Sequence, residues 1–147
     1  MTAAAAPVPQ LVIDTNVVLD LLVFSDPSTR MLSDALAAGQ LGWLATVSMR
    51  LELQRVLHYP AVRAALVARG LQGADVLARF DGSCAMRPIA PGCGVLCRDP
   101  DDQPFIDLAV AHRATLLSKD KQVLRLHRRL ATLGVVVQPV FRPSFAA

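Results

Sequence analysis

Four acidic residues could act together chemically, because each adjoins a predicted strand or begins a predicted helix: Asp14, Glu52, Asp102 and Asp120. Glu52 is the only glutamate in a chain that has 11 aspartates. Carboxylates that gather without a cation raise one another's pKa and destabilise the fold. Their oxygen atoms suit Mg²⁺ or Mn²⁺, and such ions polarise a phosphate and lower the pKa of a bound water. The four acids therefore predict a metal-dependent site that acts on phosphate esters.

Short apolar runs alternate with helical patterns along the chain. The runs predict buried strands at residues 11–13, 43–45, 115–117 and 135–137, and their unbroken apolar character is typical of strands covered on both faces. Helices are predicted at residues 28–38, 46–59, 60–69, 74–84, 100–113 and 121–133, with Gly39, Gly70 and Gly134 as stops. Residues 85–98 have no predicted element. This alternation predicts an α/β fold, a three-layer α/β/α sandwich with a central parallel β-sheet.

The predicted sheet would bring the four acids to one edge, because ligands of open parallel sheets bind beyond the carboxyl ends of the strands. Asp14 directly follows the first predicted strand, and Asp120 lies shortly after the third. Glu52 lies in the first turns of the helix after residues 43–45. Asp102 begins the helix that precedes residues 115–117. Their agreement in position indicates one shared site.

Each acid also has a structural interpretation. Asp14 and Asp120 could cap the helices that follow them, and Glu52 could pair with Arg55 on an exposed helix face. Asp99 or Asp101 could replace Asp102, since all three acids lie within four positions. The spacing to the apolar face of the following helix favours Asp102.

The composition excludes several classes of protein. Apolar residues make up 53% of the 147 residues, which excludes a disordered chain, and one glutamate with two lysines excludes a coiled coil. We expect one domain at residues 10–142, with tails at 1–9 and 143–147. No membrane-spanning segment or secretion signal is predicted. Three cysteines are an odd number for a secreted disulfide scaffold, so we expect a cytoplasmic protein with free thiols rather than a three-thiolate zinc site.

The net charge of +3 is concentrated late in the sequence. A stretch with one acid, Asp120, contains the bases that could contact a polyanion: Lys119, Lys121, Arg125, Arg128 and Arg129. A solvated helix face is the alternative interpretation. Lys119 could also pair with Asp120.

In four motifs, taken in order, the chain resembles the PIN-domain nucleases, most of all the branch of toxin components of bacterial toxin–antitoxin pairs. The motifs are an apolar strand followed by Asp14-Thr15-Asn16, Ser48 four residues before Glu52, the run of residues 98–102 before an apolar helix, and residues 116–120. The resemblance covers residues 11–140. It implies a PIN-like fold and metal-dependent hydrolysis of single-stranded RNA.

The resemblance also implies roles for residues and partners. Asp14, Glu52 and Asp102 would bind one Mg²⁺ or Mn²⁺, and Asp120 would hold a second ion or orient the attacking water. Asn16 and Ser118 would support them by hydrogen bonds, and the lysines and arginines listed above would hold the RNA backbone. A cognate antitoxin and a second copy of the chain are the implied protein partners.

Two other functions are compatible with parts of this pattern. One is a PIN fold that binds RNA or protein without catalysis. The other is a phosphoacceptor receiver domain, which would need adjacent acids where Asp14 is followed by Thr15 and Asn16.

Overall fold

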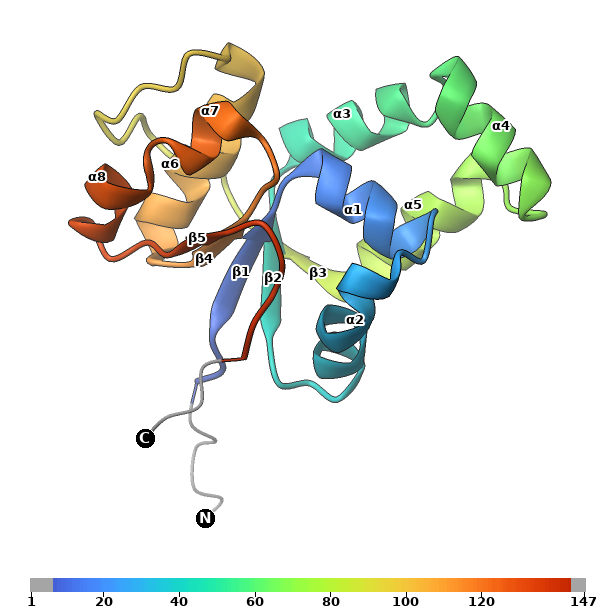
Figure 1. Cartoon of the computed structure of the whole chain (residues 1–147), viewed down its shortest axis with the longest axis horizontal. Helices are drawn as coiled ribbons and strands as arrows, with labels where there is room; N and C mark the ends of the chain where they lie inside the picture. The colour runs from blue at the N-terminus through green and yellow to red at the C-terminus, as the bar shows by residue number, and fades with distance from the viewer. Residues whose placement is uncertain (1–6, 144–147) are drawn as a thin grey trace.

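The structure, a computed structural model, describes residues 7–143 and has a parallel sheet between two layers of helices (Figure 1). The strands are β1 (Gln10–Ile13), β2 (Gly42–Ala45), β3 (Cys84–Met86), β4 (Thr115–Leu117) and β5 (Val137–Gln138). The prediction of an α/β/α sandwich with a central parallel sheet is confirmed. Most of the two predicted tails, residues 1–6 and 144–147, lies outside the described residues.

The helices divide between the two faces of the sheet. The first group lies between β1 and β3 in sequence: α1 (Thr15–Leu22), α2 (Arg30–Ala37), α3 (Val47–Val56), α4 (Pro60–Ala68) and α5 (Gly73–Ser83). The second group follows β3: α6 (Gln103–His112), α7 (Lys121–Leu124) and α8 (His127–Ala131). Right-handed crossovers place the two groups on opposite faces, and Figure 1 shows them on either side of the sheet. Two 3₁₀ turns, η1 (Pro27–Thr29) and η2 (Pro100–Asp102), precede α2 and α6.

The strand order is β3-β2-β1-β4-β5. Receiver-type sheets have the order 2-1-3-4-5, so the receiver-domain alternative is wrong. In the observed order the chain runs outward from β1 on both sides, and the direction reverses between β1 and β4. Such a switch point opens a crevice at the carboxyl ends of the two strands, where ligands of open α/β sheets bind.

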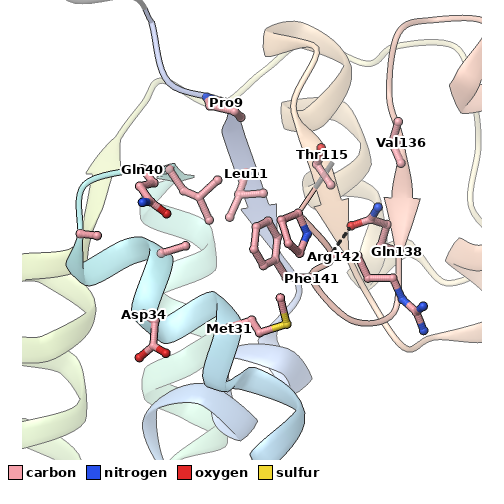
Figure 2. A pocket seen from close by; sticks show the side chains of 14 residues that line it. Pro9, Leu11, Met31, Asp34, Gln40, Thr115, Val136, Gln138, Phe141 and Arg142 are labelled. Atoms are coloured by element: carbon pink, nitrogen blue, oxygen red, sulfur yellow. Dashed lines mark hydrogen bonds between the residues drawn. The ribbon is translucent and has the colours of Figure 1, made fainter. Parts of the chain in front are cut away.

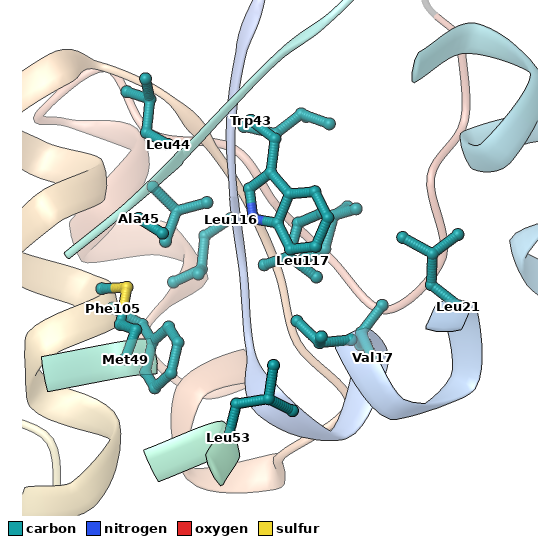
Figure 3. Packing of buried hydrophobic residues seen from close by; sticks show 14 of the residues in the cluster. Val17, Leu21, Trp43, Leu44, Ala45, Met49, Leu53, Phe105, Leu116 and Leu117 are labelled. Atoms are coloured by element: carbon teal, nitrogen blue, oxygen red, sulfur yellow. The ribbon is translucent and has the colours of Figure 1, made fainter. Parts of the chain in front are cut away.

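The core joins both helical layers to the sheet (Figure 3). Trp43 of β2 lies toward Val17 and Leu21 of α1, and its neighbour Leu44 lies on the other side of the strand (Figure 3). Trp43 also meets Phe80 of α5 edge to face, with ring centroids 5.2 Å apart. Burial on both faces explains why the strands are apolar without alternation.

Three elements differ from the prediction, and the last strand, predicted at residues 135–137, is β5 at Val137–Gln138. The edge strand β3 was not predicted, because only three residues pair with β2 and two of them are exposed. Residues 121–133 form two helices rather than one, since the His127 ring contacts the Leu124 carbonyl at 2.9 Å and α7 ends there. Helix α1 was not among the predicted helices; it was mentioned only as a short helix that Asp14 could cap.

The predicted stops are confirmed: Gly39, Gly70 and Gly134 follow α2, α4 and α8 in the left-handed region, which favours glycine. Within residues 7–143, no helix has the length and apolar character needed to cross a bilayer.

Candidate metal centre

Asp14 and Ser118 meet at the switch point, where β1 and β4 end. The register pairs Ile13 with Leu117, and the Asp14 backbone N–H donates to the Leu117 carbonyl at 2.9 Å. Ser118 is fully buried, and its hydroxyl donates to Asp14 Oδ2 at 2.7 Å. The same oxygen of Ser118 accepts the Asp120 backbone N–H at 3.1 Å. One buried hydroxyl therefore sets the positions of two predicted acids.

Asp102 is turned inward by the 3₁₀ turn that precedes α6. Pro100 begins this turn, and Asp99 caps it by accepting the Asp101 N–H at 3.0 Å. Asp102 is only 7% exposed, and its Oδ2 is the single buried side-chain polar atom among residues 7–143 without a hydrogen-bond partner. One carboxylate oxygen from each of Asp99, Asp102 and Asp120 lies within 4.8 Å of the others. A buried carboxyl oxygen with no donor is the environment that a cation would satisfy.

Glu52 reaches the same region from α3. Its Oε2 accepts a hydrogen bond from the Thr15 hydroxyl at 2.9 Å, and Thr15 is buried at the start of α1. Thr15 was not predicted as a supporting residue, whereas the predicted Asn16 is exposed. The signal that could have found Thr15 was a small hydroxyl residue directly after the acid that ends β1.

Three of the acids, Asp14, Glu52 and Asp102, have raised pKa values. Burial is the main cause for Asp14 and Glu52, and Asp120 and Asp14 respectively add like-charge repulsion. Burial, the close approach of the Asp120 carboxylate and the charge of Asp14 raise the pKa of Asp102 to about 8. These acids are therefore close enough to disfavour one another's charge.

Of the structural roles considered for the four acids, helix capping is observed for Asp120 only. Asp120 does cap α7, since its Oδ1 accepts the Gln122 N–H at 2.8 Å. Asp14 and Asp102 make no side-chain cap hydrogen bond, and Glu52 is held by Thr15 rather than by an ion pair with Arg55. Asp99 joins Asp102 in the cluster rather than replacing it.

Of the predicted RNA-contacting bases, Lys119 is already engaged. Its ammonium group pairs with Asp20 of α1, not with Asp120. The others are exposed on α7, on α8 and in the two-residue link between them: Lys121, Arg125, Arg128 and Arg129.

A separate cavity lies at the other end of the strands. It has a volume of about 740 Å³ and lies between α2 and the C-terminal segment, with Leu11 and Thr115 among its lining residues (Figure 2). Phe141 and Met31 narrow it (Figure 2). Because these residues lie at the amino ends of β1 and β4, this cavity is separate from the acids.

We expect Ser118→Ala to reduce the free energy of unfolding by about 1 kcal/mol, because a buried hydrogen bond is lost. The pKa of Asp14 should rise further, since the Ser118 hydroxyl stabilises its charged form. Carboxyl ¹³C NMR titration and chemical denaturation would measure both effects. Ser28→Ala is the matched control, because its hydroxyl also donates to an aspartate at 2.7 Å but is exposed. An unchanged Asp14 pKa in Ser118→Ala would contradict this role.

Comparisons with known proteins agree with this architecture. A family model described as PIN domain matches residues 10–122. Among solved structures, the chain is similar to a chain in the crystal structure of VapBC2 from Rickettsia felis bound to a DNA fragment from their promoter, with a TM-score of 0.62 and 14% identity. The alignment covers 88% of this chain and 97% of that chain, so the likeness in fold extends over nearly the whole domain. No curated protein sequence gives a match.

Proposed function

Because this chain belongs to the PIN-domain family, we propose that it is a divalent-metal-dependent endoribonuclease that hydrolyses phosphodiester bonds of single-stranded RNA. The observation that carries the proposal is the cluster of Asp99, Asp102 and Asp120 around an unpartnered, buried oxygen of Asp102. A purely structural set of acids would be expected to have hydrogen-bond donors for its buried oxygens.

The residues present fit a hard divalent cation. Asp99, Asp102 and Asp120 offer carboxylate oxygens that converge, and Asp14 and Glu52 lie beside them. All these donors are oxygen atoms, which Mg²⁺ and Mn²⁺ prefer. When bound, such an ion would polarise the phosphate and lower the pKa of a water molecule.

The protein's own residues would keep the acids in place. Ser118 holds the Asp14 carboxylate, and Thr15 holds one oxygen of Glu52, leaving the other oxygen available. Asp120 uses Oδ1 to cap α7 and keeps Oδ2 for an ion or for orienting the attacking water. Acids restrained in this way lose little conformational freedom when the substrate binds.

The exposed basic side chains would bind the RNA backbone. Lys121 directly follows Asp120 at the start of α7, and Arg125, Arg128 and Arg129 extend the positive charge toward and along α8. Phosphate contacts of this kind position a strand without reading its bases. The Lys119–Asp20 pair would instead restrain the segment between Ser118 and Asp120. This revises the direct RNA contact expected for Lys119.

The family branch that the motifs resemble suggests the protein context. We propose that the chain is the toxin component of a toxin–antitoxin pair, bound by a cognate antitoxin and paired with a second copy of itself. The side chain of Val67 on α4 is 81% exposed, an apolar surface that a protein partner would cover. A catalytically silent PIN-fold module is the competing proposal, and it would bind RNA without cleaving it.

An RNA cleavage assay separates these proposals. In Mg²⁺ or Mn²⁺ we expect single-stranded RNA to be cut, and Glu52→Gln should reduce the rate at least about 100-fold, the upper end of the effect of losing a residue that supports a metal ligand. EDTA should abolish cleavage. Asp34→Asn, an exposed acid beside the distant cavity, is the control. Cleavage that persists in EDTA and in Glu52→Gln would refute the proposed function.

A further inference from the structure

A groove of about 260 Å³ lies directly beside the candidate metal centre, between α3 and the corner formed by η2 and α6. Glu52 lines this groove. The charges of Asp14 and Asp101 raise its pKa, and the charge of Arg55 lowers it. The groove and the acids therefore share a side chain. A nucleotide whose phosphate lies at the acids would place an adjoining base at the groove.

The groove has an apolar floor and an apolar rim. Met49 and Phe105 are buried beneath it, and Pro104 adds a further apolar surface. Leu51 of α3 also lines it, although 58% of this side chain is exposed. An exposed leucine beside a polar site is not needed for the core, whereas the flat face of an unstacked base would cover it.

Opposite charges stand on the two walls. Arg55 comes from α3, and Asp101 comes from η2. The two ion pairs found within residues 7–143 are Arg50–Asp81 and Lys119–Asp20, so neither Arg55 nor Asp101 is held in one. Both groups are exposed and can turn toward a ligand.

The geometry points to a subsite for a guanine base of the RNA in this groove. Guanine presents two adjacent acceptors, O6 and N7, which suit the fork of an arginine. Its Watson–Crick edge presents two adjacent donors, N1–H and N2–H, which suit a carboxylate. Adenine has an amino group in place of O6, and cytosine and uracil offer at most one donor position beside the acceptors. Arg55 and Asp101 can therefore both be bidentate only with guanine.

This inference rests on the proposed function, but its binding can be tested without cleavage. Mononucleotides have no phosphodiester bond to cut, so GMP, AMP, CMP and UMP can be titrated in Mg²⁺ and followed by the amide NMR signals of residues 48–55 and 100–105. We expect GMP to bind at least about tenfold more tightly than the others. Arg55→Gln and Asp101→Asn should each reduce this preference by roughly 5- to 150-fold, the range for a bidentate base contact. Arg63→Gln on α4 is the matched control.

Cleavage of a randomised RNA pool gives the second measurement. We expect guanine to be enriched at one fixed position beside the cut, and the enrichment to be lost in Arg55→Gln but kept in Arg63→Gln. Equal binding of all four mononucleotides, or a guanine preference that survives both groove substitutions, would overturn the subsite. Selective GMP binding without RNA cleavage would support the subsite while refuting the nuclease. RNA cleavage without any base preference would support the nuclease while refuting the subsite.

Discussion

The Asp102→Asn variant is expected to lose RNA cleavage by at least about 1,000-fold and, without metal, to be more stable than the wild-type protein. The loss of activity exceeds that for a supporting residue, because the substitution removes the buried oxygen around which the acids converge. The gain in stability follows from the cost of a buried, unpaired carboxylate. An amide of the same shape does not carry that charge.

The pKa of Asp102 determines the pH range in which Asp102→Asn is more stable than the wild-type protein. It is about 8 in the folded chain, against 3.8 for an unperturbed group. Between these values the folded protein holds more protons than the unfolded protein, so the free energy of unfolding falls as the pH rises. The advantage of Asp102→Asn should therefore grow from about pH 4 to pH 8 and then level off. The difference between the two pKa values sets an upper limit of about 6 kcal/mol on the gain, at roughly 2–4 °C in Tm for each kcal/mol.

Thermal unfolding in EDTA and in Mn²⁺ would measure both effects. Mn²⁺ should stabilise the wild-type chain, because a ligand that binds only the folded state raises its stability, and it should stabilise Asp102→Asn little. Asp101→Asn is the matched control for stability, since it makes the same change one residue away at an exposed position. If Asp102→Asn is less stable than the wild type in EDTA at pH 8, the carboxylate has a structural partner and the metal assignment fails.

Divalent-ion binding itself should strengthen by about 10- to 100-fold between pH 6 and pH 8. Metal ligands must be deprotonated, so binding in this range competes with the proton on Asp102. The raised pKa values of Asp14 and Glu52 act in the same direction, since both must also be ionised. Each ion bound should release up to about one proton at neutral pH.

Calorimetric titration with Mn²⁺ in buffers of different protonation enthalpy would count the released protons. The distant acid variant Asp34→Asn should keep the full pH dependence. An affinity that is constant from pH 6 to pH 8, with no proton release, would show that Asp102 is not among the ligands. Under that result the activity of Glu52→Gln would become the deciding measurement.

The sequence by itself determined the fold class and the edge of the sheet at which the acids gather. Short unbroken apolar runs between helical patterns are typical of strands buried on both faces, and a parallel sheet brings the residues after its strands to one edge. That reasoning located Asp14 and Asp120 without knowledge of the strand order. Ser118 was also predicted as a support, and its hydroxyl joins these two residues.

Only the tertiary structure decided which neighbouring side chain points into the site. Spacing gives the period of a helix, but a shift of one residue turns a side chain by about 100°. Local spacing favoured Asp102, and the turn at Pro100 does bury Asp102 and expose Asp101, but the start of α1 buries Thr15 and exposes the predicted Asn16. Lys119 pairs with Asp20, a residue 99 positions away. Residues 84–86 form a strand because they hydrogen-bond to the edge of β2. Such choices depend on contacts between distant segments, which no local pattern encodes.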